Sequence, residues 1–418
     1  MSALTTALTA GLRPQDGDTS SGAIVRQALQ AVRTHLGMEV AYVSQFVGDD
    51  SVFREVDAPG LEAVIKPGDS KPLDDVFCRH ILAGRLPELM PDVAAEPFAT
   101  TLPIMQQAPI GKHVSVPIRL ADGEVYGMFC CLGFAADPSL QQRDLQMMRA
   151  FAELAAFEIN RDVESAKVAT EKQSRIRRVI DETMFSIAYQ PIWDVETRRP
   201  VGVESLARFA ATPSRGPDKW FAEAAESGLA VELELSAIRL ALCAVEKLPA
   251  PAYVAVNTSP ATICSGRLAD ILAAAPGARI VLEITEHADV EDYAALQAAL
   301  APIRARGVRL AIDDAGAGYS SLRHILDLQP DLIKLDMSLV RNIALDPARK
   351  ALAAALINFA QETDSQIIAE GVETAAEFAA LRALGAQKAQ GYFLAKPMPL
   401  EDVAALFAET HALRAARA

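Results

Sequence analysis

The sequence lacks the features that mark secreted, membrane-spanning and zinc-binding proteins. Its first twenty residues contain no basic segment followed by an apolar core, so we expect no signal peptide. No apolar run is long enough to span a bilayer. The five cysteines are an odd number, and none has the CxxC spacing of a zinc site. We therefore expect reduced thiols and a cytoplasmic protein.

The sequence also lacks a long basic run, and its overall charge is negative. It has 40 lysines and arginines against 54 aspartates and glutamates, which gives a net charge of −14. A field of this sign repels duplex nucleic acid, so we expect no nucleic-acid partner. An anionic small substrate remains open if metal ions and a few local cations dominate its pocket. The 418 residues, about half of them hydrophobic, are enough for two or three domains.

Periodicity in the N-terminal part predicts an α+β domain. Residues 1–20 are rich in Thr, Ser, Gly and Asp, and we expect them to form a loose leader. Helices are predicted over residues 23–36 and 74–82, and strands over residues 39–47, 51–56, 113–120 and 124–134. The sequence Ala121-Asp122-Gly123 is typical of a hairpin turn and joins the last two strands. We place this domain over residues 21–160.

Residues 139–182 contain neither glycine nor proline. Apolar residues recur at three- and four-residue steps as far as Val163, and the chain is strongly charged after it. Two interpretations remain open. The segment is either one long helix that pairs with a second copy of itself, or a closing helix followed by a solvated linker. We assign residues 161–180 to a linker helix and residues 181–418 to a second domain.

Short apolar runs alternate with helical segments in the C-terminal half, which predicts parallel strands joined by crossover helices. The runs are residues 185–189, 201–206, 253–257, 279–284, 308–313, 331–335, 366–370 and 387–392. Their number fits the α/β fold of a closed, TIM-like (β/α)8 barrel. An open doubly wound sheet is the competing fold, but no glycine-rich phosphate loop follows the first strand.

Polar residues lie at or near the ends of seven of these runs. They are Glu204, Asn257, Glu283, Asp313, Lys334, Glu370 and Gln390. Barrel enzymes build their active sites on the rim where the strands end. Carboxylates together with an Asn carbonyl favour Mg²⁺ or Mn²⁺, and zinc is not expected because no His or Cys joins the set. Lys334 adds a point cation among the acids.

Two adjacent carboxylates, Asp313 and Asp314, follow an apolar run and precede two glycines. Successive strand residues face opposite sides, so only the end of a strand lets both acids reach one site. Two neighbouring carboxylates are unfavourable unless a cation lies between them, and an Asp that bridges two divalent ions satisfies this need. Taken alone, such a pair could be an acidic turn or a helix cap. The other rim residues favour the metal site.

Two known families can be recognised in these patterns. Residues from about 175 to 410 resemble an EAL domain, the cyclic di-GMP phosphodiesterase module. The resemblance is carried, in family order, by Tyr189-Gln190-Pro191-Ile192, Glu204-Ser205-Leu206, Val256-Asn257-Thr258-Ser259-Pro260, Leu282-Glu283-Ile284-Thr285-Glu286, Asp313-Asp314 with the following loop, Ile333-Lys334-Leu335-Asp336, Ala369-Glu370-Gly371-Val372-Glu373 and Gln390-Gly391-Tyr392-Phe393. Residues 20–160 resemble a GAF sensor domain, through the segments 37–43, 72–78 and 116–120 with Asp122-Gly123 and Gly127. We find no GGDEF-like stretch, so we expect no cyclase domain on this chain.

The EAL resemblance implies hydrolysis of one phosphodiester bond of cyclic di-GMP to linear pGpG, in a homodimer. Glu204, Asn257, Glu283 and Asp313 would hold one Mg²⁺ or Mn²⁺ ion. Asp313, Asp314 and Glu370 would hold a second. Lys334 would orient the attacking water, and in a one-metal account Glu370 would be the general base. The sequence does not separate the two accounts.

The resemblance also assigns residues around the metals. Arg208, Leu206, Gln190 and Gln390 would bind the substrate, and Glu286 and Glu373 would support the loops of the site. The ligand of the GAF domain is not identified. Cys78 is expected to be a buried structural thiol rather than a chromophore attachment site.

Three positions depart from the family pattern. Ser205, Ala315 and Ala317 stand where family members usually have Ala, Phe and Thr. The last two remove an aromatic anchor and a hydroxyl from the loop that would shape the second metal site. We therefore expect activity that is weak or dependent on the sensor and the dimer. Two other functions stay open: a catalytically silent receptor for cyclic di-GMP, and an interaction module that has lost the ligand.

Overall fold

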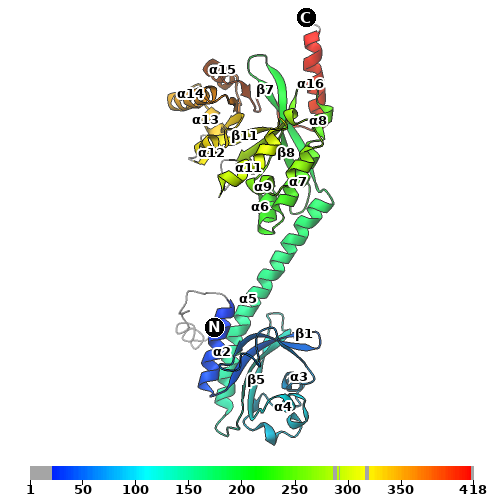
Figure 1. The fold of residues 1–418 in the computed structure, drawn as a ribbon, viewed down its shortest axis with the longest axis vertical. Helices are drawn as coiled ribbons and strands as arrows, with labels where there is room; N and C mark the ends of the chain where they lie inside the picture. Colours follow the sequence, from blue (N-terminus) through cyan, green and yellow to red (C-terminus); the bar gives the residue numbers. More distant parts are fainter. Residues whose placement is uncertain (1–20, 286–289, 291, 316–319, 416–418) are drawn as a thin grey trace. The chain divides into compact units, whose positions relative to one another are not determined.

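The computed structural model describes residues 21–285, 290, 292–315 and 320–415, with backbone only at residues 320, 321 and 411–415 (Figure 1). The loop residues Glu286 and Ala317 therefore lie outside the described residues. The chain divides into two compact units, Met1–Val168 and Ala169–Ala418.

The first unit is an antiparallel sheet of six strands in the order β3-β2-β1-β6-β5-β4. The strands are β1 (Val40–Val47), β2 (Asp50–Asp57), β3 (Ser70–Pro72), β4 (Leu89–Met90), β5 (Lys112–Arg119) and β6 (Val125–Gly133). The helices are α2 (Ser21–His35), α3 (Phe77–Leu82), α4 (Ile104–Gln107) and the first part of α5 (Gln142–Asp181), with 3-10 turns η1 (Val93–Ala95) and η2 (Ala99–Thr101). The predicted α+β arrangement is confirmed.

Both faces of the sheet are buried at strand β6. Successive side chains of a strand point to opposite faces, and strand β6 shows the consequence. Phe129 and Cys131 pack with apolar residues of α2 and α5 on one face. Met128 and Cys130 pack with apolar residues of α3 on the other. Because neither face meets water, the strand is apolar throughout instead of alternating with polar residues.

Helix α5 is continuous over Gln142–Asp181, so the interpretation as one long helix is correct. No proline removes a backbone donor and no glycine weakens the helix within this span. Met148 and Phe151 pack into the core of the first unit, and Ile176 and Val179 pack into a core of the second. Pairing of this helix with a second copy stays a prediction.

The second unit contains a closed eight-stranded barrel in the order β10-β11-β12-β13-β14-β7-β8-β9. The strands are β7 (Phe185–Asp194), β8 (Arg199–Phe209), β9 (Tyr253–Asn257), β10 (Ile280–Thr285), β11 (Arg309–Ala315), β12 (Leu332–Leu335), β13 (Gln366–Ala369) and β14 (Lys388–Ala389). The helices are α6 (Pro217–Glu226), α7 (Ala230–Ala241), α8 (Ala244–Lys247), α9 (Pro260–Cys264), α10 (Leu268–Leu272), α11 (Tyr293–Arg304), α12 (Ser320–Leu328), α13 (Met337–Val340), α14 (Pro347–Glu362), α15 (Ala375–Leu384) and α16 (Leu400–Ala415), with a 3-10 turn η3 (Gly277–Arg279).

One part of the barrel prediction is wrong. Strand β7 runs antiparallel to both of its neighbours, β8 and β14, whereas all eight strands were expected to be parallel. It joins β8 through a short turn after Asp194 instead of a crossover helix. The length of an apolar run does not encode its direction, because antiparallel strands need only a short connection and parallel strands need a long one. The eight strands nevertheless close.

Two apolar layers stabilise the barrel. Side chains such as Ile192, Val281 and Leu332 fill its interior. Alternate residues such as Val254, Leu282 and further strand residues pack outward against the surrounding helices. This doubly buried arrangement explains the nearly continuous apolar runs. It also leaves the strand ends as the places where polar side chains gather. Among the described helices, none combines the length and apolar character needed to cross a bilayer.

Candidate metal centre

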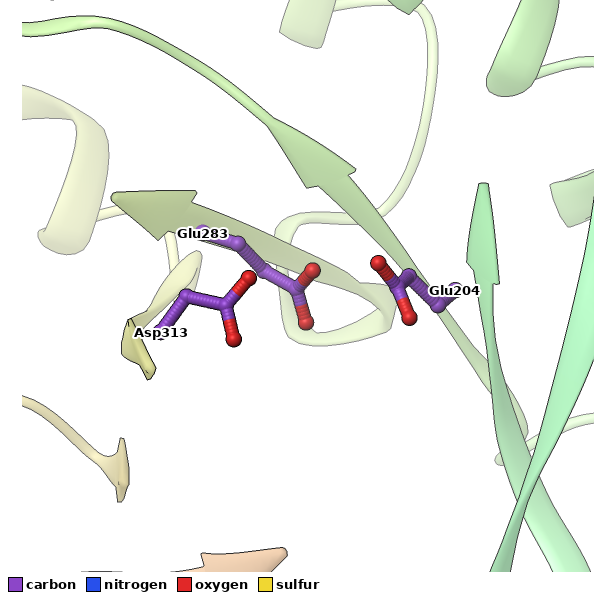
Figure 2. Close-up of side chains that lie close together, drawn as sticks. All are labelled: Glu204, Glu283 and Asp313. Atoms are coloured by element: carbon purple, nitrogen blue, oxygen red, sulfur yellow. The ribbon is translucent and has the colours of Figure 1, made fainter. Parts of the chain in front are cut away.

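Three carboxylates from three strands meet at the C-terminal rim of the barrel. Glu204 lies on β8, Glu283 on β10 and Asp313 on β11, and Figure 2 shows their side chains pointing into the same space. Each offers an oxygen, and these oxygens all lie within 4.8 Å of one another. The three residues are 8%, 0% and 8% exposed. Such burial of like charges is unfavourable unless a cation accompanies them.

A second group of acids shares Asp313 with the first. Oxygens of Asp313, Asp314 and Glu370 also lie within 4.8 Å of one another. Asp314 has a φ of +57° at an irregularity in the pairing of β11 with β12. Consecutive residues of a regular strand face opposite sides, so this left-handed residue is what allows both aspartates to reach one site. The backbone N–H of Asp314 donates to Asp313 Oδ1 at 2.9 Å.

Lys334 lies among these acids, on β12. Its Nζ is 2.8 Å from Glu370 Oε1, 3.0 Å from Glu283 Oε2, 3.1 Å from Asp313 Oδ1 and 3.6 Å from Glu204 Oε1. The side chain is fully buried, although lysine is among the residue types least often found so. One ammonium thus contacts four carboxylates.

The surroundings shift the pKa of three of these groups. Burial raises the pKa of Glu283 to about 8, against the lowering effect of Lys334. Burial likewise raises the pKa of Glu370 well above its ordinary value. Burial would lower the pKa of Lys334, but Glu204, Glu283 and the other two acids raise it well above its ordinary value. The raised pKa values mean that one lysine is not enough to keep all four acids ionised, and that a further cation would favour their ionised form.

The donor set fits a hard divalent cation. Glu283 Oε1 is buried and has no hydrogen-bond partner among the described residues. A buried carboxylate oxygen without a partner is costly, and a metal ion would satisfy it. Asn257, at the end of β9, is the register partner of Glu283 on the neighbouring strand and adds an amide oxygen nearby. Oxygen donors of this kind suit Mg²⁺ and Mn²⁺.

Two glutamines border the acids. Gln390 Nε2 donates to Glu204 Oε2 at 2.6 Å and to Gln190 Oε1 at 3.1 Å. Gln190 Nε2 in turn donates to the carbonyl oxygen of Ala395 at 3.1 Å. These bonds orient the carboxylate of Glu204 towards the cluster. The expected role of both glutamines in substrate binding stays a prediction.

A cleft of about 450 Å³ opens beside the acids, at the ends of β8, β9 and β10. Leu206, Arg208 and Asn257 line it, as do Glu234 and Phe221 from the covering helices. Leu206 and Arg208 on β8, two of the residues expected to bind substrate, therefore line one cavity. A third, Gln190, lies instead in the hydrogen-bonded chain next to Glu204.

Sequence reasoning missed Glu234. Its Oε2 accepts hydrogen bonds of 2.9 Å from both the backbone N–H and the hydroxyl of Ser259. Ser259 belongs to the Asn257 motif and also caps α9, so Glu234 holds the loop that follows β9. Glu234 is part of no recognisable motif, because a lone acid on a helix resembles any solvent-facing residue. Its role is visible only once α7 is packed against the barrel.

One of the remaining predicted residues, Glu373, pairs with an arginine instead of joining the acids. The Glu373 carboxylate is 2.9 Å from Arg341 and half exposed. Its proposed part in supporting the site stays a prediction, and Glu286 lies outside the described residues. Ala315, where the family pattern has Phe, ends β11 and is buried in the core between the barrel and its helices.

Comparison with known proteins agrees with this geometry. The EAL domain family matches residues 173–397, and the GAF domain family matches residues 18–160. A cyclic di-GMP phosphodiesterase of Pseudomonas aeruginosa is 32% identical over 234 residues, which are 53% of this chain and 40% of that protein. An uncharacterized protein of Mycobacterium tuberculosis is 27% identical over 333 residues, 74% of this chain and 52% of that one. The chain spans about half the length, or less, of these curated relatives.

Solved structures give the same result for the barrel. The PaMucR phosphodiesterase in complex with c-di-GMP is 28% identical and has a TM-score of 0.51, covering 56% of this chain and 99% of that one. An EAL domain protein from Listeria monocytogenes EGD-e is 25% identical with a TM-score of 0.50, covering 56% and 95%. The family match covers more than half of the chain. The chain therefore belongs to the EAL domain family, and its EAL domain follows a GAF domain.

Proposed function

We propose that this protein hydrolyses one phosphodiester bond of cyclic di-GMP to give linear pGpG, with Mg²⁺ or Mn²⁺ as its cofactor. The observation that carries the proposal is the pair of acid groups sharing Asp313, together with a cleft lined by Asn257 and Arg208. The relatives named as cyclic di-GMP phosphodiesterases support the choice of substrate.

The residues divide into two metal sets in this proposal. Glu204, Asn257, Glu283 and Asp313 would hold one ion, and Asp313, Asp314 and Glu370 a second. When bound, such ions lower the pKa of a coordinated water and neutralise charge on the phosphate. Lys334 would donate a hydrogen bond to the attacking water and so hold it in place. Its ammonium is suitably placed, since it lies among the four acids that would hold the metal ions. In a one-metal account Glu370 would instead accept the proton of that water.

The cleft would bind the rest of the substrate. Arg208 would contact a phosphate oxygen, and the apolar wall formed by Leu206, Phe221 and Ile238 would pack against a base. Gln390 would keep Glu204 oriented through its 2.6 Å hydrogen bond. Exclusion of water by this wall would strengthen the electrostatic contacts made inside the cleft.

Product analysis tests the proposal. Metal-free protein is mixed with labelled cyclic di-GMP and Mg²⁺ or Mn²⁺, and pGpG is separated by chromatography under single-turnover conditions. We expect Asp313→Asn to lower the rate by at least about 100-fold. Glu226→Gln, an acid-to-amide change at an exposed ion pair on α6, is the matched control and should keep the wild-type rate. Equal rates for wild-type protein and Asp313→Asn would refute the proposal.

A second candidate is a receptor that binds cyclic di-GMP without cleaving it. The observation in its favour is Lys334, whose ammonium already contacts all four acids and could hold the cluster together without metal. Ala315 points the same way, because it stands where the family pattern has an aromatic residue. Calorimetry in EDTA separates the two: a receptor would bind cyclic di-GMP with unchanged affinity, and no pGpG would appear after metal is added.

We also propose that the enzyme acts as a homodimer regulated by its GAF domain. Leu322 and Leu326 lie four residues apart on α12 and are 46% and 64% exposed, a pattern that suits a contact with another copy. Light scattering of wild-type protein and of a Leu326→Glu variant tests this. A dimer that becomes a monomer in the variant supports it, and a monomer in both contradicts it.

A further inference from the structure

A group of polar side chains is buried in the first unit, where the apolar core would otherwise be continuous. Cys78 on α3, His113 and Ser115 on β5, and Cys130 on β6 are each at most 1% exposed. The side chains lie on the sheet face that packs against α3. Buried polar groups are retained in a core only where they interact with one another or with a ligand.

Three of these side chains converge on the sulfur of Cys130. The Ser115 hydroxyl lies 3.1 Å from Cys130 Sγ. The Cys78 thiol and the His113 ring both interact with the same sulfur. Register explains the approach of β5, because Ser115 is the direct partner of Cys130 across the antiparallel pair. The neighbouring Cys131 points to the opposite face and takes no part in this contact.

The two clustered cysteines are chemically unequal. Burial raises the pKa of Cys130, but contacts with Cys78, His113 and Ser115 lower it to about 5. Contact with Cys130, followed by burial, raises the pKa of Cys78 well above its ordinary value. The contacts around Cys130 thus favour its ionised form, while the contact with Cys130 opposes ionisation of Cys78. A thiolate beside a thiol is the arrangement of a reactive cysteine and its resolving partner.

A cavity of about 310 Å³ lies beside this cluster, and its lining includes His113 but neither Cys78 nor Cys130. Tyr42, Phe77 and His113 line it. His113 contacts Cys130, and Phe77 directly precedes Cys78 in the chain. The Nδ1 atom of His113 is buried and has no hydrogen-bond partner among the described residues. A small polar molecule in the cavity would find an unoccupied hydrogen-bonding group next to the sulfur of Cys130.

We propose that Cys130 and Cys78 form a reversible redox pair that reacts with hydrogen peroxide or another small hydroperoxide. This site is separate from the metal centre and does not depend on the proposed hydrolysis. It goes beyond the expectation that Cys78 is a buried structural thiol, whose burial the structure confirms. Three features together carry the inference: two neighbouring buried cysteines in one core cluster, the Ser115 hydroxyl 3.1 Å from Cys130 Sγ, and a cavity whose wall includes His113.

The reaction balances with the hydroperoxide as the oxidant. The Cys130 thiolate attacks one peroxide oxygen, the O–O bond breaks, and Cys130 becomes a sulfenic acid while hydroxide leaves and is protonated to water. The Cys78 sulfur then attacks the Cys130 sulfur, and the S–O bond breaks. The released hydroxyl takes the proton of Cys78 and leaves as a second water. The two thiols lose two electrons to form a disulfide, and the peroxide gains them.

Mass spectrometry of the full chain tests the proposal. Reduced protein is treated with a small excess of hydrogen peroxide, quenched with catalase and measured intact, then digested and mapped without reduction. We expect a loss of about 2 Da, a Cys78–Cys130 cross-linked peptide, and recovery of the starting mass with dithiothreitol. Cys131→Ser, a change at the neighbouring buried cysteine, should behave as wild type.

Variants of the pair define the order of the steps. Cys78→Ser should stop at a sulfenic acid on Cys130, seen as a gain of about 16 Da or as an adduct with a cyclic 1,3-dione. Cys130→Ser should give neither product. Ser115→Ala keeps both cysteines but removes the hydroxyl next to Cys130 Sγ, and it should slow the reaction about fivefold. A slower reaction in this folded variant would show that the effect is on reactivity and not on folding. Peroxide that leaves Cys78 and Cys130 as thiols in folded wild-type protein, or that couples other cysteines instead, would overturn the proposal.

Discussion

Two buried lysines of the barrel unit show how surroundings decide the effect of a charge. Lys334 contacts four carboxylates, which raise its pKa well above the ordinary value although burial alone would lower it. Burial lowers the pKa of Lys388 to about 8, and the nearby guanidinium of Arg309 adds to the lowering. Asp194 opposes this shift, and Lys388 Nζ donates to Gln366 Oε1. The first lysine should stabilise the fold and the second should destabilise it.

Replacing Lys334 by Met should destabilise the metal-free protein by about 3 kcal/mol at pH 7. The change leaves four clustered acids without their cation, and breaking a buried ion pair costs about this much. Added Mg²⁺ or Mn²⁺ should recover part of the loss, because a divalent ion can neutralise the same acids. Urea denaturation in EDTA and in metal measures both effects. A variant as stable as wild type in EDTA would contradict the assignment of Lys334 as the neutralising charge.

Replacing Lys388 by Met should have the opposite effect and raise the free energy of unfolding. The folded pKa, about 8, lies below the ordinary value of 10.5, so the folded state is penalised wherever Lys388 is charged. That penalty is complete below pH 8 and disappears as the pH rises towards 10.5. After allowing for one lost hydrogen bond, we expect a gain of about 2 kcal/mol in unfolding free energy at pH 7. Chemical denaturation should show a smaller gain in unfolding free energy at pH 10 than at pH 7. A variant less stable than wild type at pH 7 would contradict the prediction.

At the scale of elements, an ion-pair network joins α5 to the barrel unit. Glu223 on α6 is 2.7 Å from Arg175 on α5 and 2.6 Å from Arg215, and its carboxylate is almost fully buried. Arg215 in turn stacks 3.9 Å above the ring of Trp220. Burial would raise the pKa of Glu223, but the two arginines hold it below the ordinary value. The carboxylate thus stabilises the fold above its pKa and loses this effect in acid.

Replacing Glu223 by Gln should therefore cost about 3 kcal/mol at pH 7, since two arginines lose a buried partner. The difference from wild type should shrink as the pH falls below the ordinary glutamate value and the wild-type carboxylate also becomes protonated. Glu226→Gln on the same helix removes a mostly exposed pair with Lys172 and should cost less than about 0.5 kcal/mol. Chemical denaturation of both variants measures these losses of unfolding free energy. Equal losses in the two variants would show that the network at Glu223 does not hold α5.

At the scale of the whole molecule, the cores of the two units are separate. The apolar clusters of the first unit share no residue with those of the second, and α5 is the element that passes from one to the other. The acids that would hold metal all belong to the second unit. Metal binding should therefore stabilise that unit selectively.

Scanning calorimetry with and without Mn²⁺ measures this selectivity. We expect two transitions, of which one moves upward with metal, by an amount equivalent to about 2.7 kcal/mol at a metal concentration 100 times the dissociation constant. Glu283→Gln should abolish the movement because it alters the fully buried ligand. A metal-dependent rise of both transitions by the same amount would show that the units unfold together.

Much of the fold could be predicted from the sequence because hydrophobic periodicity is local. The expected strand over residues 253–257 is β9, and the expected helix over residues 139–182 is α5 within a few residues of each end. The direction of β7 could not be predicted, because it depends on which strands close the barrel. Residue types and spacing identified the rim acids in the same way, since strand ends are recognisable from runs of apolar residues.

The sequence by itself determined the order of the longer elements, the family and the identity of the acids at the strand ends, because these depend on short-range patterns and motif spacing. It did not indicate the short strands β3 and β4 or the short helix α4. Only the tertiary structure decided the contacts of Lys334 with four acids, the support of Ser259 by Glu234, and the meeting of Cys78 with Cys130. Each of these contacts joins residues far apart in the chain. Their distances and burial follow from the packing of strands and helices, and no local sequence pattern encodes them.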